Sequence, residues 1–249
     1  LLGGVFVTTN RYQEAARARA ERRAVTGILG LGPMADVLVV QQSLSPAQRR
    51  VVYREVGTAA DSELVFTYEG RLVRHAPVRA GAAETGLIPV GRLFVARENG
   101  ALRGFVVEGE ARGYKNRIRF FVGLSPAFEI AGVRVLEHEE DPGLGAEIAT
   151  PVFQGQFLGR SAAGLVSLTV TRDPMPEDWR AALATLARTP VARWRERHAA
   201  LLARQGGKPV YAITGATISS RALTDGVRET VDHFQRRWAL LGPYLGSPS

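Results

Sequence analysis

The chain has 249 residues, of which 45% are hydrophobic and 22% charged, an ordinary composition for a globular protein. It contains no cysteine, which excludes disulfides, thiolate metal sites and cysteine nucleophiles, and its four histidines lack the spacing of metal ligands. The net charge of +8 suits an acidic partner, an anionic surface or simply a basic surface that binds nothing. Only Lys115 and Lys208 of the 32 basic residues are lysines, and this arginine bias reflects genome composition more than function.

The first ten residues are the candidate for a membrane element. Leu1 to Val7 are apolar or glycine, but a membrane span needs about 20 such residues. We interpret residues 1–10 as the end of a membrane anchor or, alternatively, as a buried strand. The residues that follow oppose export because they carry a run of positive charge: Arg11, Arg17, Arg19, Arg22 and Arg23.

Residues 11–75 are predicted to form an N-terminal α/β segment. An Ala-, Glu- and Arg-rich helix is expected over residues 11–30, ending near Gly27. Residues 43–57 are interpreted as a second helix, because Ser45 suits a cap and Pro46 suits the first turn. Two β-rich runs over residues 63–78 predict a hairpin with its turn at Glu69 and Gly70.

The middle of the chain predicts a largely antiparallel sheet. A second hairpin is expected over residues 92–111, with Asn99 and Gly100 at its turn. Two further strands are expected at 117–124 and 130–137, and a short one at 164–170. Strands in series with helices toward both ends predict the α+β class, a sheet flanked by helices.

Apolar residues recur at helical spacing from 176 to 205, and Thr189-Pro190 is expected to separate two helices. The arginines of this stretch are interpreted as a solvated face. A final amphipathic helix is expected to start near Ser219 or Ser220. Its apolar positions are spaced by 4, 4, 3 and 4: Leu223, Val227, Val231, Phe234 and Trp238.

A cluster of hydroxyl groups marks the start of this last helix. The sequence YAITGATISS places Thr214, Thr217, Ser219 and Ser220 around a tight turn at Gly215. The first turn of a helix leaves backbone N–H groups unpaired and favours a phosphate. The plainer interpretation is a helix cap made by Ser219 or Ser220.

A second glycine-containing segment follows the strand at 130–137. The sequence EHEEDPGLGAEI, residues 137–148, contains Pro142, Gly143, Leu144 and Gly145. Two glycines around one apolar residue allow the backbone to approach a flat ligand closely, with Leu144 as a packing surface.

Together and in this order, the two segments resemble the FMN-binding domain family, which the Rnf electron-transport complex (in its G subunit) and the sodium-translocating NADH:quinone reductase (in its C subunit) share. The first family motif, Glu-Thr-Pro-Gly-Leu-Gly after a His, reads here from His138 and Glu140 to Gly145. The second, Ser/Thr-Gly-Ala-Thr with further hydroxyls, runs from Thr214 to Ser220. The resemblance covers residues 76–170 and 208–240.

The resemblance implies that Thr217 carries FMN as a phosphoester, attached by a separate flavin transferase. The FMN-binding domain would extend over 76–245, with a helical insertion at about 172–205. Gly215 and Ala216 would leave room for the cofactor, and neighbouring hydroxyls would hydrogen-bond its phosphate. The implied cofactor-binding residues are Thr217, Thr214, Gly215, Ala216, Ser219, Ser220, Glu140, Pro142, Gly143, Leu144 and Gly145.

Three features depart from the family pattern. Tyr211 stands where the family has an Asp that the transferase is expected to recognise. Asp141 replaces the Thr of the first motif and would put a carboxylate beside the flavin if it points inward. The insertion at 172–205 is interpreted as a partner-docking element or, alternatively, as a surface excursion.

The leading functional hypothesis is an electron-transfer subunit of a bacterial membrane redox complex, with its soluble domain on the periplasmic side of the inner membrane. It would exchange electrons with other membrane subunits rather than turn over a substrate of its own, so no catalytic residue is assigned. The alternatives are a structural subunit without covalent flavin, an electron donor to a flavin reductase and, remotely, a nucleic-acid-binding protein, a reading for which only net charge argues.

Overall fold

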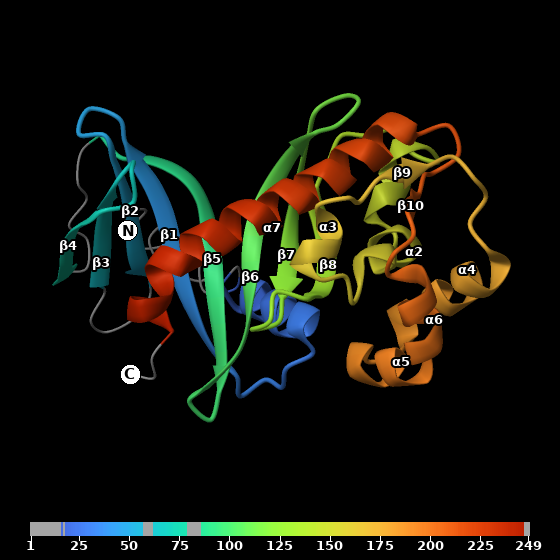
Figure 1. Ribbon diagram of the computed structural model, residues 1–249, viewed down its shortest axis with the longest axis horizontal. Helices are drawn as coiled ribbons and strands as arrows, with labels where there is room; N and C mark the ends of the chain where they lie inside the picture. Colours follow the sequence, from blue (N-terminus) through green and yellow to red (C-terminus); the bar gives the residue numbers. More distant parts are fainter. Residues whose placement is uncertain (1–15, 17, 57–61, 79–85, 247–249) are drawn as a thin grey trace, which may run out of the picture.

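The computed structural model describes residues 16, 18–56, 62–78 and 86–246. Its main feature is an eight-stranded antiparallel sheet with the order β4-β3-β2-β1-β5-β6-β7-β8 (Figure 1). The predicted α+β class is confirmed, and the strands on either side of the boundary expected at 75/76 belong to this one sheet. The strands are β1 Asp36–Ser45, β2 Arg50–Val56, β3 Ser62–Thr67, β4 Leu72–Pro77, β5 Ile88–Glu98, β6 Ala101–Arg112, β7 Arg117–Leu124 and β8 Ile130–Glu137.

The predicted hairpins form because their turn residues accept the required backbone angles. Asn99 and Gly100 have φ of 53° and 77°, and Glu98 pairs with Ala101 across the turn between β5 and β6. Gly70 has φ of 87° between β3 and β4. The bounds of β7 and β8 are those predicted.

Two of the predicted elements are wrong. In place of the helix predicted over 43–57, the described residues 43–56 are the end of β1, a turn and β2, because Val52 and Tyr53 are buried and β2 pairs with both β1 and β3. This tertiary pairing outweighs the local helix-start signal of Ser45 and Pro46. Residues 164–169 are not a strand, and of the predicted run only Val170 belongs to one, β9. The Ser161 side chain instead caps a short helix, Ala162–Leu165, by accepting from Gly164 N at 3.1 Å.

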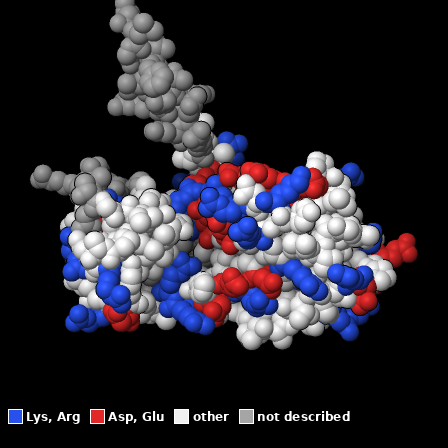
Figure 2. Space-filling model, turned by 90° about the horizontal axis from the view of Figure 1, so that it is seen from above, with Lys and Arg blue, Asp and Glu red and all other residues white. Residues whose placement is uncertain are grey.

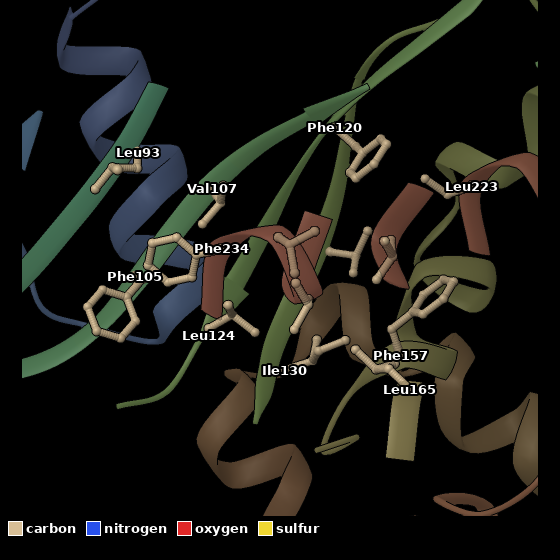
Figure 3. Packing of buried hydrophobic residues seen from close by; sticks show 14 of the residues in the cluster. Leu93, Phe105, Val107, Phe120, Leu124, Ile130, Phe157, Leu165, Leu223 and Phe234 are labelled. Carbon is tan, nitrogen blue, oxygen red and sulfur yellow. The ribbon is translucent and has the colours of Figure 1, made fainter. Parts of the chain in front are cut away.

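Two helices cover opposite faces of the sheet (Figure 1). Helix α7, Thr217–Leu245, crosses one face and packs the largest core there, as its predicted apolar positions require (Figure 3). The helix of residues 18–29, which ends two residues beyond the predicted Gly27, packs a smaller core on the other face. Strand residues alternate between the two cores: Phe105, Val107, Phe120 and Val122 face α7, while Val106 and Phe121 face the N-terminal helix.

Glycine lets α7 lie close to the sheet at one point. A Cβ atom at Gly226 would lie 2.7 Å from the Cβ of Ala111 on β6 and 3.0 Å from the Phe120 ring. Any larger side chain at 226 therefore pushes the helix off the strands.

Most of the remaining elements lie beyond the β8 edge of the sheet, and α3 lies next to α7 (Figure 1). A two-stranded parallel sheet pairs β9, Val170–Thr171, with β10, Val210–Tyr211, and β10 is the last strand before α7. Within the described part of the chain, no helix combines the length and apolarity needed to cross a membrane, and residues 1–10 lie outside that part. The elements are η1 Gly145–Ala149, α2 Pro151–Gln154, η2 Gly155–Phe157, α3 Ala162–Leu165, β9 Val170–Thr171, α4 Glu177–Ala184, η3 Leu186–Arg188, α5 Val191–Arg197, α6 Ala199–Gln205 and β10 Val210–Tyr211.

Candidate functional site

A cavity of about 700 Å³ lies between three segments of chain next to the start of α7. The segments are the motif loop with η1 and α2, the beginning of the insertion, and the turn from β10 into α7. Its size suits a cofactor-sized ligand. The lining residues are Gly143, Glu147, Thr150, Val152, Phe153, Gln156, Arg172, Asp173, Pro174, Met175, Arg180, Tyr211, Ala212, Ile213, Thr214, Gly215 and Thr217.

Thr217 is the first residue of α7 and lines this cavity. The helix begins earlier than predicted, its N-cap position is Ala216, and no side chain caps it. The interpretation of Ser219 or Ser220 as an ordinary cap is therefore wrong. An uncapped first turn leaves backbone N–H groups and the positive end of the helix dipole available to an anion at the start of α7.

The serines of the predicted cluster face away from the cavity. Ser220 is fully buried; its Oγ accepts a hydrogen bond from Ile213 N at 3.1 Å and donates one to Ala216 O at 2.9 Å, which fixes the turn around Gly215. Ser219 is also buried and donates to the carboxylate of Glu140. Of the four hydroxyl residues, only Thr214 and Thr217 reach the cavity.

Glu140 holds three segments together from a buried position. Its carboxylate accepts hydrogen bonds from Tyr114 N at 3.2 Å and Lys115 N at 3.0 Å, and from the Ser219 hydroxyl. Burial raises the pKa of Glu140, but these hydrogen bonds outweigh burial and hold it below its ordinary value. Glu140 therefore joins the 113–116 turn to the first turn of α7 and does not line the cavity.

The motif loop 141–145 is shaped by glycine. Gly143 has φ of +72°, and a Cβ atom at Gly145 would lie 2.7 Å from Ser219 Oγ and 2.8 Å from Glu140 Oε2. Gly143 is the only member of Pro142–Gly145 that lines the cavity within the described structure. Leu144 is 45% exposed and lies against Gly215, where an added Cβ would be 3.0 Å from Leu144 Cδ2.

Asp141 does not face the cavity. Its carboxylate pairs with Lys115, and its carbonyl oxygen accepts from Leu144 N at 3.1 Å and Ala146 N at 3.0 Å. The inward-pointing carboxylate considered from the sequence is therefore not present at this position.

The sequence did not indicate several of the cavity residues. Phe153 and Gln156 come from α2 and η2, Arg172 directly follows β9, and Arg180 belongs to the stretch 176–205, whose arginines were interpreted as a solvated face. Tyr211, singled out only as a departure from the family pattern, also lines the cavity. Gln156 fixes the Tyr211 backbone twice: Tyr211 N donates to Gln156 Oε1 at 2.8 Å, and Gln156 Nε2 donates to Tyr211 O at 3.1 Å.

The donor set of this cavity fits a flavin nucleotide. Thr217 at an uncapped helix start and the guanidinium groups of Arg172 and Arg180 suit a phosphate, while Phe153 and Met175 give apolar wall for a flat ring. Fold and site thus define a domain that holds a phosphate-bearing aromatic cofactor.

Comparison with known protein families also indicates a flavin-binding domain. Residues 113–232, just under half of the chain, match the FMN-binding domain family. FMN is accordingly the cofactor of the domain, and the resemblance predicted from the two motifs is confirmed.

The similar curated proteins are components of redox complexes. The G subunit of the proton-translocating ferredoxin:NAD(+) oxidoreductase complex of Clostridium ljungdahlii is 28% identical over 139 residues, which are 56% of this chain and 57% of that protein. The G subunit of the ion-translocating oxidoreductase complex of Methanosarcina acetivorans is 35% identical over 136 residues, which are 54% of this chain and 53% of that protein. The chain therefore spans little more than half the length of these relatives.

Among solved structures, the C subunit of the Na(+)-translocating NADH-quinone reductase of Parabacteroides distasonis superposes with a TM-score of 0.49 at 15% identity. The superposition covers 90% of this chain and 94% of that one.

Proposed function

We propose that this chain is the electron-carrying subunit of an ion-translocating oxidoreductase complex of the kind its relatives belong to, with FMN attached to Thr217 as a phosphoester. When bound, FMN supplies reversible one- and two-electron chemistry, and the protein supplies position and electrostatics. The observation that carries the proposal is the uncapped start of α7 with Thr217 facing the cavity.

The residues around the cavity have distinct tasks. The Thr217 hydroxyl oxygen forms the ester, and the helix start stabilises the charge that remains on the phosphate. Gly215, with φ of +79°, and Gly143, with φ of +72°, allow the two turns that line the cavity beside Thr217. The Thr214 hydroxyl is placed to donate a hydrogen bond to a ligand oxygen.

The predicted roles of Ser219, Ser220 and Glu140 change in this proposal. They hold the turn and the helix start in place instead of touching the cofactor. The domain extent of 76–245 stays a prediction.

We assign maturation to a separate flavin transferase, which would use an activated flavin nucleotide: the Thr217 oxygen bonds to the FMN phosphorus as the bond to the activating group breaks, and that group leaves while the hydroxyl proton is released. Because Tyr211 stands at the position of the family's Asp, the transferase has to accept a tyrosine where it is expected to recognise an acid. Attachment to a membrane through the segment that includes residues 1–10, on the periplasmic side, completes the proposed setting, and the other subunits of the complex are the electron donors and acceptors.

Intact mass of the native protein, followed by mapping of the peptide over residues 208–228, tests the proposal. An added mass of FMN minus water on Thr217 is the expected result and would show that the transferase accepts Tyr211. An unmodified peptide from cells that contain the transferase would contradict covalent attachment and favour the alternative, a subunit that binds FMN non-covalently or serves as scaffold.

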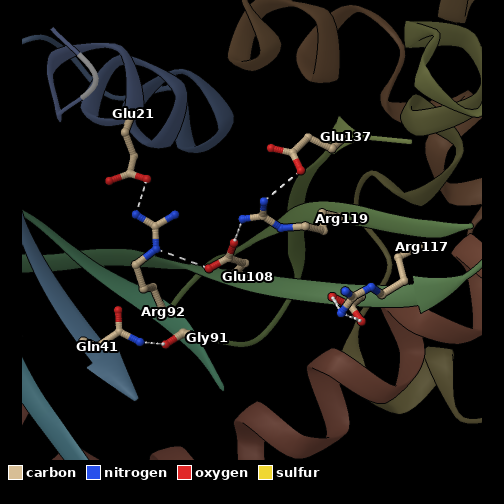
Figure 4. A network of polar contacts seen from close by, with 9 residues as sticks. Glu21, Gln41, Gly91, Arg92, Glu108, Arg117, Arg119 and Glu137 are labelled. Atoms are coloured by element: carbon tan, nitrogen blue, oxygen red, sulfur yellow. Dashed lines mark hydrogen bonds and ion pairs between the residues drawn. The ribbon is translucent and has the colours of Figure 1, made fainter. Parts of the chain in front are cut away.

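Ion pairs on the surface bear on the remote alternative, a nucleic-acid-binding protein, for which only the net charge argues. On the sheet face near the N-terminal helix, Arg92 bridges Glu21 and Glu108, and Arg119 bridges Glu108 and Glu137 (Figure 4). Over the described residues of the face in Figure 2, arginines and carboxylates lie interspersed. Such pairing weakens the argument from net charge for nucleic-acid binding.

A further inference from the structure

The helical insertion of residues 172–205 contributes a wall to the flavin cavity. Asp173, Pro174, Met175 and Arg180 line it, together with Arg172 at the end of β9. From the sequence, the insertion was interpreted as a partner-docking element or a surface excursion. Neither interpretation places it at the wall of the cavity.

The insertion is held in this position by a core of its own. Trp179, Leu183 and Trp194 are buried together with Leu158, and Val152 and Tyr211 of the cavity wall pack against them. Trp194 Nε1 donates to Ala182 O at 2.9 Å, which ties α5 to α4.

Close contacts fix the insertion to the rest of the domain at two places. A Cβ atom at Gly155 would lie 2.7 Å from Leu183 Cδ2, so α4 packs directly on the backbone between α2 and η2. At the far end of the insertion, the buried Arg160 donates to Gln156 O at 2.8 Å and to Gly206 O and Lys208 O, each at 2.9 Å. A wall anchored at both ends presents its side chains to the cavity in fixed positions.

Charge distinguishes Arg180 among these side chains. Within the insertion, Arg195 pairs with Glu129 and Arg204 with Asp178, but no ion pair joins Arg172 or Arg180 to any described residue. The cavity also contains two carboxylates, Glu147 and Asp173, and Asp173 accepts a hydrogen bond from Thr171 Oγ1 at 2.7 Å. A guanidinium that lines a ligand cavity without a carboxylate partner suits a phosphate.

We propose that Arg180, carried into the cavity by α4 and assisted by Arg172, binds the phosphate of FMN and makes the cavity prefer phosphorylated flavin over riboflavin. This inference rests on the proposed function, because it assigns residues to the same cofactor site. It gives the insertion a task in cofactor selection that is independent of whether the ester on Thr217 forms.

Binding of free FMN and of riboflavin to the Thr217→Val protein, followed by flavin fluorescence at low salt, tests the proposal. We expect FMN to bind at least tenfold more tightly than riboflavin, and Arg180→Gln to remove about tenfold of that preference while riboflavin binding is unchanged. Arg180→Lys should retain part of the preference. Added salt should lower FMN binding more than riboflavin binding.

Arg188→Gln is the matched control, because Arg188 is exposed on η3 of the same insertion and does not line the cavity. Equal binding of the two flavins, no binding of either, or equal effects of Arg180→Gln and Arg188→Gln would each overturn the proposal. Peptide mapping of the wild-type protein separates this failure from that of the proposed function. If the wild type carries flavin on Thr217 but Arg180→Gln leaves the FMN preference unchanged, only the role of Arg180 is refuted.

Discussion

The two ends of α7 are completed in different ways. At the C-terminal end, the Arg97 guanidinium donates a hydrogen bond to Leu245 O, so the protein supplies a cation to the negative end of the helix. At the N-terminal end, Ala216 offers no side-chain cap, and Thr217 faces a cavity that contains arginines. The same helix is thus satisfied internally where it supports the sheet and left to a ligand where it meets the site.

Because the two ends of α7 differ in this way, we expect substitutions at its N-terminal end to change flavin content and substitutions elsewhere to change stability. The largest effect is expected for Thr217→Val, which removes the ester oxygen and should abolish flavin that stays bound after denaturation. Thr214→Val, three residues earlier on the same cavity wall, removes the proposed hydrogen bond to the ligand but not the ester oxygen, and should keep flavin that stays bound after denaturation. Flavin retained by the Thr217 variant would place the attachment elsewhere.

Glu140→Ala tests the support of the N-terminal end. Loss of the buried carboxylate leaves Tyr114 N, Lys115 N and the Ser219 hydroxyl without their acceptor, and we expect unfolding free energy to fall by about 2–3 kcal/mol in urea titrations. Glu139→Ala, at the exposed neighbouring position, should change it by less than about 0.5 kcal/mol. Equal effects of the two variants would refute the role of Glu140.

The middle of α7 offers a smaller effect. Alanine in place of a helical glycine normally adds up to about 1 kcal/mol of stability. Gly226→Ala should instead destabilise by about 1–2 kcal/mol, because the new methyl group meets Ala111 and Phe120. Gly27→Ala is the control, since Gly27 lies in the N-terminal helix with nothing within 4 Å of an added Cβ, and thermal unfolding should show it unchanged or stabilised.

The pH dependence of stability gives a further test of Glu140. Its folded pKa lies below the ordinary value of 4.5, so its contribution is fully present above that pH and is lost as pH falls through the folded value. Glu140→Gln should flatten the acid limb of the stability curve relative to the wild type. An unchanged acid limb would show that other carboxylates dominate acid unfolding.

The smallest effect is expected at the C-terminal end. Arg97→Met removes the cation from Leu245 O and should cost about 1 kcal/mol of stability while flavin content stays at the wild-type level. Loss of flavin in this variant would contradict the expectation that the C-terminal end of α7 affects stability alone.

What the sequence predicts well is local. The turn at Asn99 and Gly100 and the apolar spacing from Leu223 to Phe234 depend on neighbouring residues, and both appear as predicted. The strand β2 could not be predicted from Ser45 and Pro46, because its pairing with β1 and β3 joins segments that local signals do not connect.

The residues of the site were likewise predictable only where a local motif marks them. Thr217 was identified by a motif, whereas Ser219 and Ser220 in the same motif face inward, because α7 starts at Thr217 and the turn before it closes on Ser220. Arg180 had no local signal, since only the folding of the insertion back onto Gly155 and Tyr211 brings it to the cavity.

We propose above that the flavin phosphate forms a diester with Thr217 at the start of α7. Phosphorus NMR of the folded, flavin-containing protein, titrated from about pH 5 to pH 8, tests it directly, because a phosphate monoester has a second pKa near 6 and a diester has none. A resonance that stays constant across the titration is the predicted result. A resonance that moves with pH would show a free monoester and contradict covalent attachment at Thr217.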